Sequence, residues 1–185
     1  TEFWMMDAEA DFVEHAESMQ IQEDLIRYVI RDVLAKCDTE LTILERDKAA
    51  LAAADAPFKI MTHREAIDYL RSKGSEITHG SDLGAADEVL LTEGSPVPIF
   101  IEKWPKEIKA FYMKRDPDNP DLVLGSDLIA PDGFGEIIGG SQREDDHDLL
   151  LERMKAEKMP LEDYQWFLDL RKYGSVPHSG FGVGL

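Results

Sequence analysis

The sequence predicts an α+β fold in which an antiparallel sheet is flanked by helices. Three observations support this prediction. The N-terminal stretch TEFWMMDAEADF alternates as a strand does, apolar residues recur at helical spacing over residues 18–37, and the turn sequence PDGFG separates two apolar stretches within residues 122–141. Hairpin strands with separate helices are typical of α+β domains rather than of doubly wound parallel sheets.

The first strand is expected within residues 1–12. Because successive side chains of a strand point to opposite faces, alternate residues should share one face. These residues are Phe3, Met5, Asp7 and Glu9. The helix over residues 18–37 follows, and its apolar stripe predicts that one side packs against the sheet.

The second helix is expected after the sequence THREAI. The hydroxyl of Thr62 can accept a hydrogen bond from the first turn, and the Glu65 carboxylate can reach back, which together make a capping box. This helix should run to about Lys73 and end at Gly74, because glycine tolerates the backbone angles that terminate a helix.

The rest of the chain predicts a hairpin and two helices. SPVPIFIEKW and DLVLGSDLIAP are expected to be strands, and EIIGG is the return strand after the PDGFG turn. Residues 147–158 and 161–172 are expected to be helices, with Pro160 at the start of the second.

Composition narrows the class of protein. A chain of 185 residues with 43% hydrophobic and 31% charged residues is typical of one soluble globular domain. Cys37 is the single cysteine, so no disulfide framework can form within the chain, which favours a reducing, cytoplasmic compartment. No apolar run approaches the roughly 18 residues of a membrane helix, so no membrane partner is expected.

The net charge of −18 argues against broad, nonspecific binding to a phosphate backbone. A nucleic-acid partner would therefore require a local basic patch. The candidate patch consists of Lys103, Lys106, Lys109, Lys114 and Arg115. A charged surface in contact with water is the simpler interpretation of these residues.

The stretch GEIIGGSQRE, residues 135–144, places an acid and a base at the two ends of a strand with glycines in its middle. Asp127 on the outgoing strand and Glu136 on the return strand form a carboxylate pair suited to Mg²⁺ with nucleotide phosphates. The glycines would let a ligand lie flat on the sheet, and Arg143 could clamp a planar polar group. A solvated hairpin end remains the alternative interpretation.

Strand parity sets a condition on this site. Glu136 and Arg143 have opposite parity, so an unbroken strand would point them to opposite faces. They can share a pocket only if the strand breaks or bulges, and the sequence predicts the bulge after the two glycines.

Several long motifs occur in a characteristic order: TEFWMMDAE, THREAIDYL, HGSDLGAADE, WPKEIKAFYM, GEIIGGSQRE, LLLERMK and WFLDLRKYGSVPHSGFGVGL. Together they resemble the catalytic domain of class II aminoacyl-tRNA synthetases of the aspartyl/asparaginyl group. Aspartyl members tend to read something like SGAQR and PPHGGFG where this chain has GGSQR and SVPHSGFG, so the resemblance is nearest to the asparaginyl members. It covers nearly the whole chain.

The resemblance implies a ligase of protein biosynthesis. Such an enzyme activates asparagine with ATP to an aminoacyl-adenylate and transfers the aminoacyl group to the acceptor end of tRNA(Asn), with Mg²⁺ as cofactor. Positioning and charge neutralisation would carry the rate. The intact enzyme is expected to be a cytoplasmic homodimer.

The resemblance also assigns roles to residues. Asp127 and Glu136 match the carboxylates that hold Mg²⁺ and the ATP phosphates, and Arg143 matches the arginine that reads the side chain of the amino acid. Glu136 and Arg143 are thus the expected catalytic residues. Phe3 matches the aromatic residue that stacks on adenine, and Asp7 is placed to bind the substrate ammonium. The glycines that match the floor of the site are Gly180, Gly182 and Gly184.

Residues 1–185 are then expected to be a truncated catalytic domain that starts within the second class II motif and ends within the third. Lacking the arginine of each motif, this piece alone is expected to be inactive. An arginine only donates hydrogen bonds, so preference for asparagine over aspartate also requires an acceptor, for which Asp7 or Glu9 is the candidate. An aspartyl-tRNA synthetase, a synthetase-like asparagine synthetase and a non-catalytic binding domain remain alternatives.

Overall fold

The computed structural model describes residues 2–184, so Thr1 of the expected first strand lies outside the described residues. Within this range seven strands form one sheet, in the spatial order β1-β7-β6-β5-β3-β2, with β4 paired to β5. The strands are β1 Met5–Asp11, β2 Lys59–Thr62, β3 Ile99–Pro105, β4 Arg115–Asp116, β5 Asn119–Ala130, β6 Gly135–Gln142 and β7 His178–Gly184.

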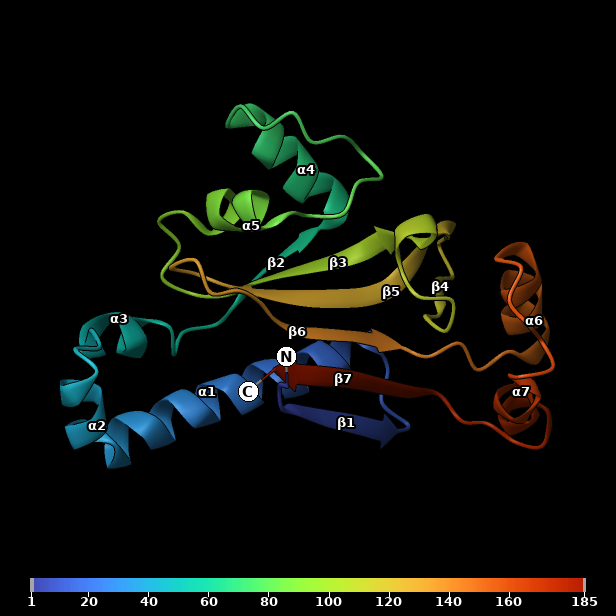
Figure 1. Cartoon of the computed structure of the whole chain (residues 1–185), viewed down its shortest axis with the longest axis horizontal. Coiled ribbons are helices and arrows are strands. Elements are labelled where there is room, and N and C mark those ends of the chain that lie inside the picture. The colour runs from blue at the N-terminus through green and yellow to red at the C-terminus, as the bar shows by residue number, and fades with distance from the viewer. Residues whose placement is uncertain (1, 185) are drawn as a thin grey trace.

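Helices surround this sheet on three sides (Figure 1). They are α1 His15–Lys36, α2 Asp38–Ile43, α3 Lys48–Ala53, α4 His63–Ser72, α5 Ala85–Thr92, α6 His147–Ala156 and α7 Gln165–Lys172, with a short 3₁₀ turn, η1, at Lys106–Ile108. In the view of Figure 1, α4 and α5 lie above the sheet, α1 runs along the lower side, and α6 and α7 stand at the right-hand end. Among the described helices, none combines the length and the apolar composition that crossing a membrane requires.

The predicted capping box is confirmed. Thr62 Oγ1 accepts a hydrogen bond from the Glu65 N–H at 3.3 Å, and Glu65 Oε2 accepts one from the Thr62 N–H at 2.7 Å. The helix ends at Ser72, and Gly74 adopts a positive φ of 95° just beyond it. The hairpin is also confirmed, because β5 and β6 pair antiparallel on either side of the PDGFG turn. The capping box and the hairpin could be predicted because each is specified by a short stretch of sequence.

Two expectations require correction. The second C-terminal helix begins at Gln165 rather than at 161, because the residues after Pro160 form turns whose N–H groups donate three residues back. Leu161 and Tyr164 in this segment pack against the small core between α6 and α7, which holds it in turns. The sheet is mixed rather than purely antiparallel, since β2 pairs parallel with β3.

The two faces of the sheet carry separate apolar clusters. The face toward α1 buries Met19, Phe58, Val97, Phe100, Leu128, Ile138, Phe181 and Val183. The opposite face, toward α4 and α5, buries Ala66, Leu70, Leu91, Ile99, Ile101, Trp104, Val123 and Ile129. Within the sheet, α4 mainly contacts β2 and β3, and α5 mainly contacts β5 and β6. Part of the second face, over β1, β7 and the rest of β6, is therefore left free for a site.

We expect Leu70→Ala to lower the free energy of unfolding by about 2–5 kcal/mol, because Leu70 is fully buried between α4 and the sheet and its removal leaves a cavity. Chemical denaturation measures this loss. Val89→Ala on α5 is the control, since Val89 is 51% exposed and its truncation should change stability by no more than about 0.5 kcal/mol. Equal losses in both variants would contradict the assigned core.

Candidate active site

A cleft of about 660 Å³ lies on the free part of the second sheet face. It is lined by residues of β1, β5, β6 and β7 and of the segment between β3 and β4. The residues that line it are Met5, Asp7, Glu9, Lys109, Tyr112, Met113, Asp127, Glu136, Ile137, Gly139, Gly140, Arg143, Phe181, Gly182 and Gly184. Most of the residues expected from sequence are therefore brought together in one cavity.

The acids of β1 lie opposite glycines of β7. Asp7 pairs with Gly182 and Glu9 with Gly180, and residues paired across strands share a face. A Cβ atom on Gly182 would lie 2.9 Å from Asp7 Oδ1, and one on Gly180 would overlap the Glu9 carboxylate. Of the three glycines expected to form the floor, Gly182 and Gly184 line the cleft and Gly180 does not. Gly180 and Gly182 leave the room that the neighbouring carboxylates occupy.

The expected carboxylate pair is also present. Asp127 on β5 pairs with Gly139 on the adjacent antiparallel strand β6, and Glu136 lies at the start of that strand. A Cβ atom on Gly139 would lie 2.8 Å from Glu136 Oε1 and 3.9 Å from Asp127 Oδ1. Both carboxylates therefore reach the space above the same glycine and face the same cleft.

A bulge at Ile137 makes this arrangement possible. The pairing passes from Leu128 with Ile138 to Ile129 with Glu136, so Ile137 is the extra residue. The extra residue turns Glu136 onto the face of Asp127. The expectation of a bulge after the glycines was wrong in position. The bulge lies before them, next to the hairpin turn, and regular alternation from Gly139 then carries Arg143 to the same face.

The carboxylate pair is electrostatically crowded. Burial of the carboxylate in the cleft and the neighbouring charge of Asp127 raise the pKa of Glu136 to about 7, with smaller contributions from Glu88 and Asp82, although the residue as a whole is exposed. Asp127 is 5% exposed, and burial raises its pKa against the opposing effect of Lys109. Both groups would be stabilised in their charged forms by an additional cation.

The donor set fits Mg²⁺. Two carboxylates facing one cavity are hard oxygen ligands of the kind this ion prefers. Within residues 2–184 no cluster of three or more His, Cys, Asp or Glu side chains could enclose a metal ion. A Mg²⁺ at Asp127 and Glu136 would therefore need further oxygen ligands, which phosphate groups and water supply in nucleotide sites.

Arg143 occupies the other end of the cleft. Its Nη2 donates to Glu9 Oε1 at 2.6 Å and its Nη1 donates to Ser141 Oγ at 2.6 Å. The guanidinium carbon lies 5.1 Å from the centre of the Tyr112 ring. The backbone N–H of Arg143 donates to the His178 carbonyl at 2.9 Å. The side chain is thus held on several sides and is presented to the cavity next to the Glu9 carboxylate.

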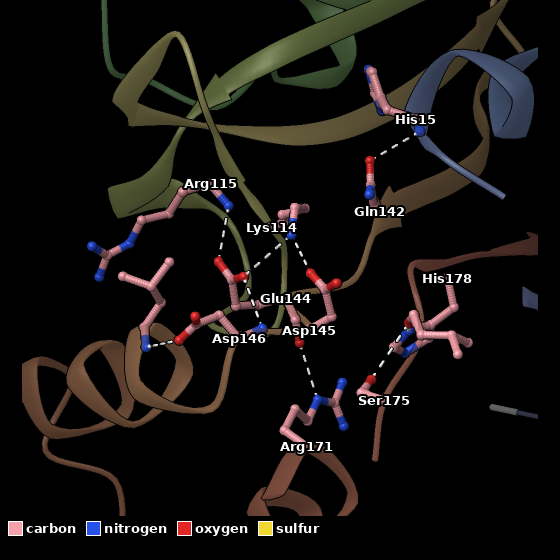
Figure 2. Close-up of polar contacts among 12 residues, drawn as sticks. His15, Lys114, Arg115, Gln142, Glu144, Asp145, Asp146, Arg171, Ser175 and His178 are labelled. Atoms are coloured by element: carbon pink, nitrogen blue, oxygen red, sulfur yellow. Dashed lines mark hydrogen bonds and ion pairs between the residues drawn. The ribbon is translucent and has the colours of Figure 1, made fainter. Parts of the chain in front are cut away.

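The neighbours of Arg143 in the chain anchor it (Figure 2). Glu144, 3% exposed, accepts hydrogen bonds at its carboxylate from the Arg115 N–H, and its carbonyl accepts one from Arg171 Nε at 3.0 Å. On the other side, Gln142 Oε1 accepts a hydrogen bond from the first N–H of α1 at 3.1 Å. Buried polar contacts on both sides therefore fix the backbone from which Arg143 projects.

Phe3 lies apart from this cavity. It precedes β1, its side chain is 72% exposed, and it does not line the cleft. Its expected stacking on adenine stays a prediction. Sequence reasoning also missed the contribution of Lys109, Tyr112 and Met113, which reach the cleft from the segment after β3. The only local sequence feature that pointed to these cleft residues was the aromatic pair in WPKEIKAFYM.

The candidate basic patch is neutralised by acids. Each of its five cations forms an ion pair within the described residues, which favours the interpretation as a charged surface. The pairs are Lys103–Asp116, Lys106–Asp121, Lys109–Asp127, Lys114–Asp145 and Arg115–Glu152. Lys109 differs from the others because it points into the cleft.

We expect Glu136→Gln to change how stability depends on pH in the absence of divalent cations. The folded pKa of Glu136, about 7, exceeds its ordinary value of 4.5. The stability that this group contributes is therefore fully present below about pH 4.5 and lost as pH rises through about 7. Relative to the variant, the melting temperature of the unchanged chain should fall between about pH 5 and about pH 8. Parallel melting curves across this range would contradict the crowded carboxylate pair.

The chain is similar to known proteins along its whole length. The family model for tRNA synthetases class II (D, K and N) matches residues 1–185. Asparagine–tRNA ligases from Pelotomaculum thermopropionicum and Thermococcus gammatolerans are 50% and 49% identical to it, over 100% of this chain and 43% of each relative. The crystal structure of asparaginyl-tRNA synthetase from Pyrococcus horikoshii complexed with asparaginyl-adenylate superposes with a TM-score of 0.95 at 48% identity, covering 98% of this chain and 42% of that one. The chain thus spans less than half the length of these relatives.

Proposed function

The chain belongs to the family of class II tRNA synthetases (D, K and N), and from this we propose that it activates asparagine with ATP as the catalytic part of an asparagine–tRNA ligase. The product would be asparaginyl-adenylate, from which the aminoacyl group passes to the acceptor end of tRNA(Asn). The identity to asparagine–tRNA ligases over the whole chain supports this proposal. On the same family grounds we propose Mg²⁺ as cofactor, a homodimeric intact enzyme and a cytoplasmic location.

The Glu9–Arg143 pair is the observation that supports asparagine, rather than aspartate, as the amino acid substrate. A carboxamide has one accepting oxygen and one donating NH₂ group, whereas a carboxylate only accepts. Arg143 supplies donors and Glu9 supplies an acceptor, and their closest atoms are 2.6 Å apart. A carboxamide laid beside both groups would satisfy each of them. An aspartate carboxylate would meet the negative charge of Glu9, so the pair selects against it.

The opposite end of the cleft suits the phosphates of ATP. Asp127 and Glu136 would hold Mg²⁺, which supplies charge neutralisation at the phosphate oxygens. Asp7, over Gly182 in the middle of the floor, is proposed to bind the substrate ammonium, and Phe3 to stack on adenine. With the side chain and ammonium held, the substrate carboxylate is directed at the α-phosphate, and one of its oxygens displaces pyrophosphate. The residues contribute by orientation rather than by covalent chemistry.

The test is ATP–pyrophosphate exchange in a hybrid enzyme, in which this chain replaces the matching segment of the Pyrococcus horikoshii asparaginyl-tRNA synthetase. The hybrid supplies the parts of the relatives that lie outside the matched segment. Exchange that requires asparagine supports the proposal. Exchange that requires aspartate would assign the chain to an aspartate-activating enzyme, and a folded hybrid without exchange for either amino acid would overturn it.

We expect Glu9→Gln in the hybrid to weaken the preference for asparagine over aspartate. The variant keeps an acceptor for the amide but removes the charge that repels aspartate. The ratio of the two kcat/KM values should fall by at least about tenfold, which corresponds to about 1.4 kcal/mol. An unchanged ratio would show that another group rejects aspartate.

We expect Arg143→Lys in the hybrid to weaken asparagine use while leaving the KM for ATP nearly unchanged. Lysine keeps the charge but lacks the planar fork that contacts both Glu9 and Ser141. The loss in kcat/KM for asparagine should correspond to about 2–5 kcal/mol. If the KM for ATP shifts as much as that for asparagine, Arg143 belongs to the nucleotide end of the cleft.

A further inference from the structure

Lys109 points into the cleft but has no role in the function proposed above. Its Nζ lies 2.5 Å from Asp127 Oδ2 and 3.9 Å from Asp82 Oδ1. The Lys109 side chain is 12% exposed and that of Asp127 is 6% exposed. A mostly buried ion pair therefore sits on one of the two carboxylates that fit a metal ion.

The ammonium is held from below by an aromatic ring. Lys109 Nζ lies 3.8 Å from the centre of the Trp104 ring, and Trp104 is 1% exposed in the core under α4. A cation over an indole face is attracted by the negative face of the ring. Trp104 is itself fixed, because its Nε1 donates to the Ile101 carbonyl at 2.9 Å.

The backbone that carries Lys109 is fixed by α6. Arg153, 5% exposed, uses Nη2 to donate to the carbonyls of Lys106 at 2.6 Å and Lys109 at 2.5 Å. Lys106 is the first residue of η1, and Lys109 directly follows it. Lys109 is therefore attached to a braced turn, and its reach into the cleft is built into the fold.

The two oxygens of Asp127 have different neighbours. Oδ2 accepts from Lys109, whereas Oδ1 lies with Glu136 Oε1 near the space above Gly139. If Asp127 and Glu136 held a divalent ion, a second positive charge would lie close to the ammonium. Like charges repel strongly where water is largely excluded, so the ion and the ammonium compete for Asp127.

We propose that Lys109 is the internal counter-cation of this site. Its ammonium holds Asp127 when no metal is bound, would leave Asp127 Oδ2 when Asp127 and Glu136 hold a divalent cation, and would then contact the ATP phosphates. The first two steps concern this chain alone, and the third rests on the proposed function. The competition lowers affinity for the free metal ion, so the ion binds best together with a nucleotide that offers the ammonium a new partner.

The first test is Mn²⁺ binding to this chain without nucleotide, measured by electron paramagnetic resonance. Lys109→Met keeps the length of the side chain but removes the competing charge, so Mn²⁺ should bind about tenfold more tightly. Lys106→Met is the matched control, because Lys106 lies on the same turn but pairs with the exposed Asp121. An Mn²⁺ affinity of the Lys109 variant equal to that of the control would overturn the proposal.

A second measurement follows Lys109 itself without replacing it. The lysines of the unchanged chain are reductively methylated with ¹³C, which preserves their charge, and the Lys109 signal is assigned by its absence in Lys109→Arg. Addition of Mg²⁺ should shift the Lys109 signal and leave that of Lys106 in place. If the Lys109 signal does not move while the site fills with Mg²⁺, displacement does not occur.

The hybrid enzyme separates this inference from the proposed function. Lys109→Met should lower its asparagine-dependent exchange by about 10², the effect of losing one preorganised contact to a developing charge. Unchanged exchange in this variant would overturn the contact with phosphate. If the unchanged hybrid shows no exchange while Mn²⁺ binding responds as expected, the proposed function fails and the counter-cation role stands.

Discussion

The site depends on one constraint of the sheet: three of the four acids that line it lie across from a glycine on the next strand. Asp7 pairs with Gly182, Glu9 with Gly180, and Asp127 with Gly139. A carboxylate needs space, and it needs water or a cation beside it. A side chain on the facing strand would fill that space. The glycines therefore do more than clear a surface for a ligand, because they allow three negative charges to lie flat on a sheet that is packed on its other face.

From this constraint the cleft acquires two chemically different ends. At one end a bulge at Ile137 turns Glu136 toward Asp127, so that two carboxylates face one space and the pKa of Glu136 rises to about 7. At the other end regular alternation brings Arg143 beside Glu9. A phosphate-bearing, metal-bound group suits the first end, and a planar amide suits the second. The direction proposed for the substrate in the cleft follows from this polarity.

The helices outside the sheet fix the backbone next to two cleft residues, Lys109 and Arg143, which the strands alone do not position. Arg153 of α6 braces the turn that carries Lys109, and Arg171 of α7 binds the carbonyl of Glu144 next to Arg143. Both arginines are largely buried. Removing such a group would leave buried carbonyls without partners, which is costly. The small core between α6 and α7 thus supports both ends of the cleft through backbone contacts.

Local signals in the sequence determined the capping box at Thr62, the β5–β6 hairpin and the candidate residues Asp127, Glu136 and Arg143. The motif resemblance determined the family. Tertiary structure alone decided where the bulge lies, that β7 inserts between β1 and β6, and that Lys109 reaches Asp127. Strand register depends on hydrogen bonds between segments far apart in the chain, and Glu9 meets Arg143 across 134 positions. Such pairings leave no periodic trace in either segment, so only the folded chain reveals them.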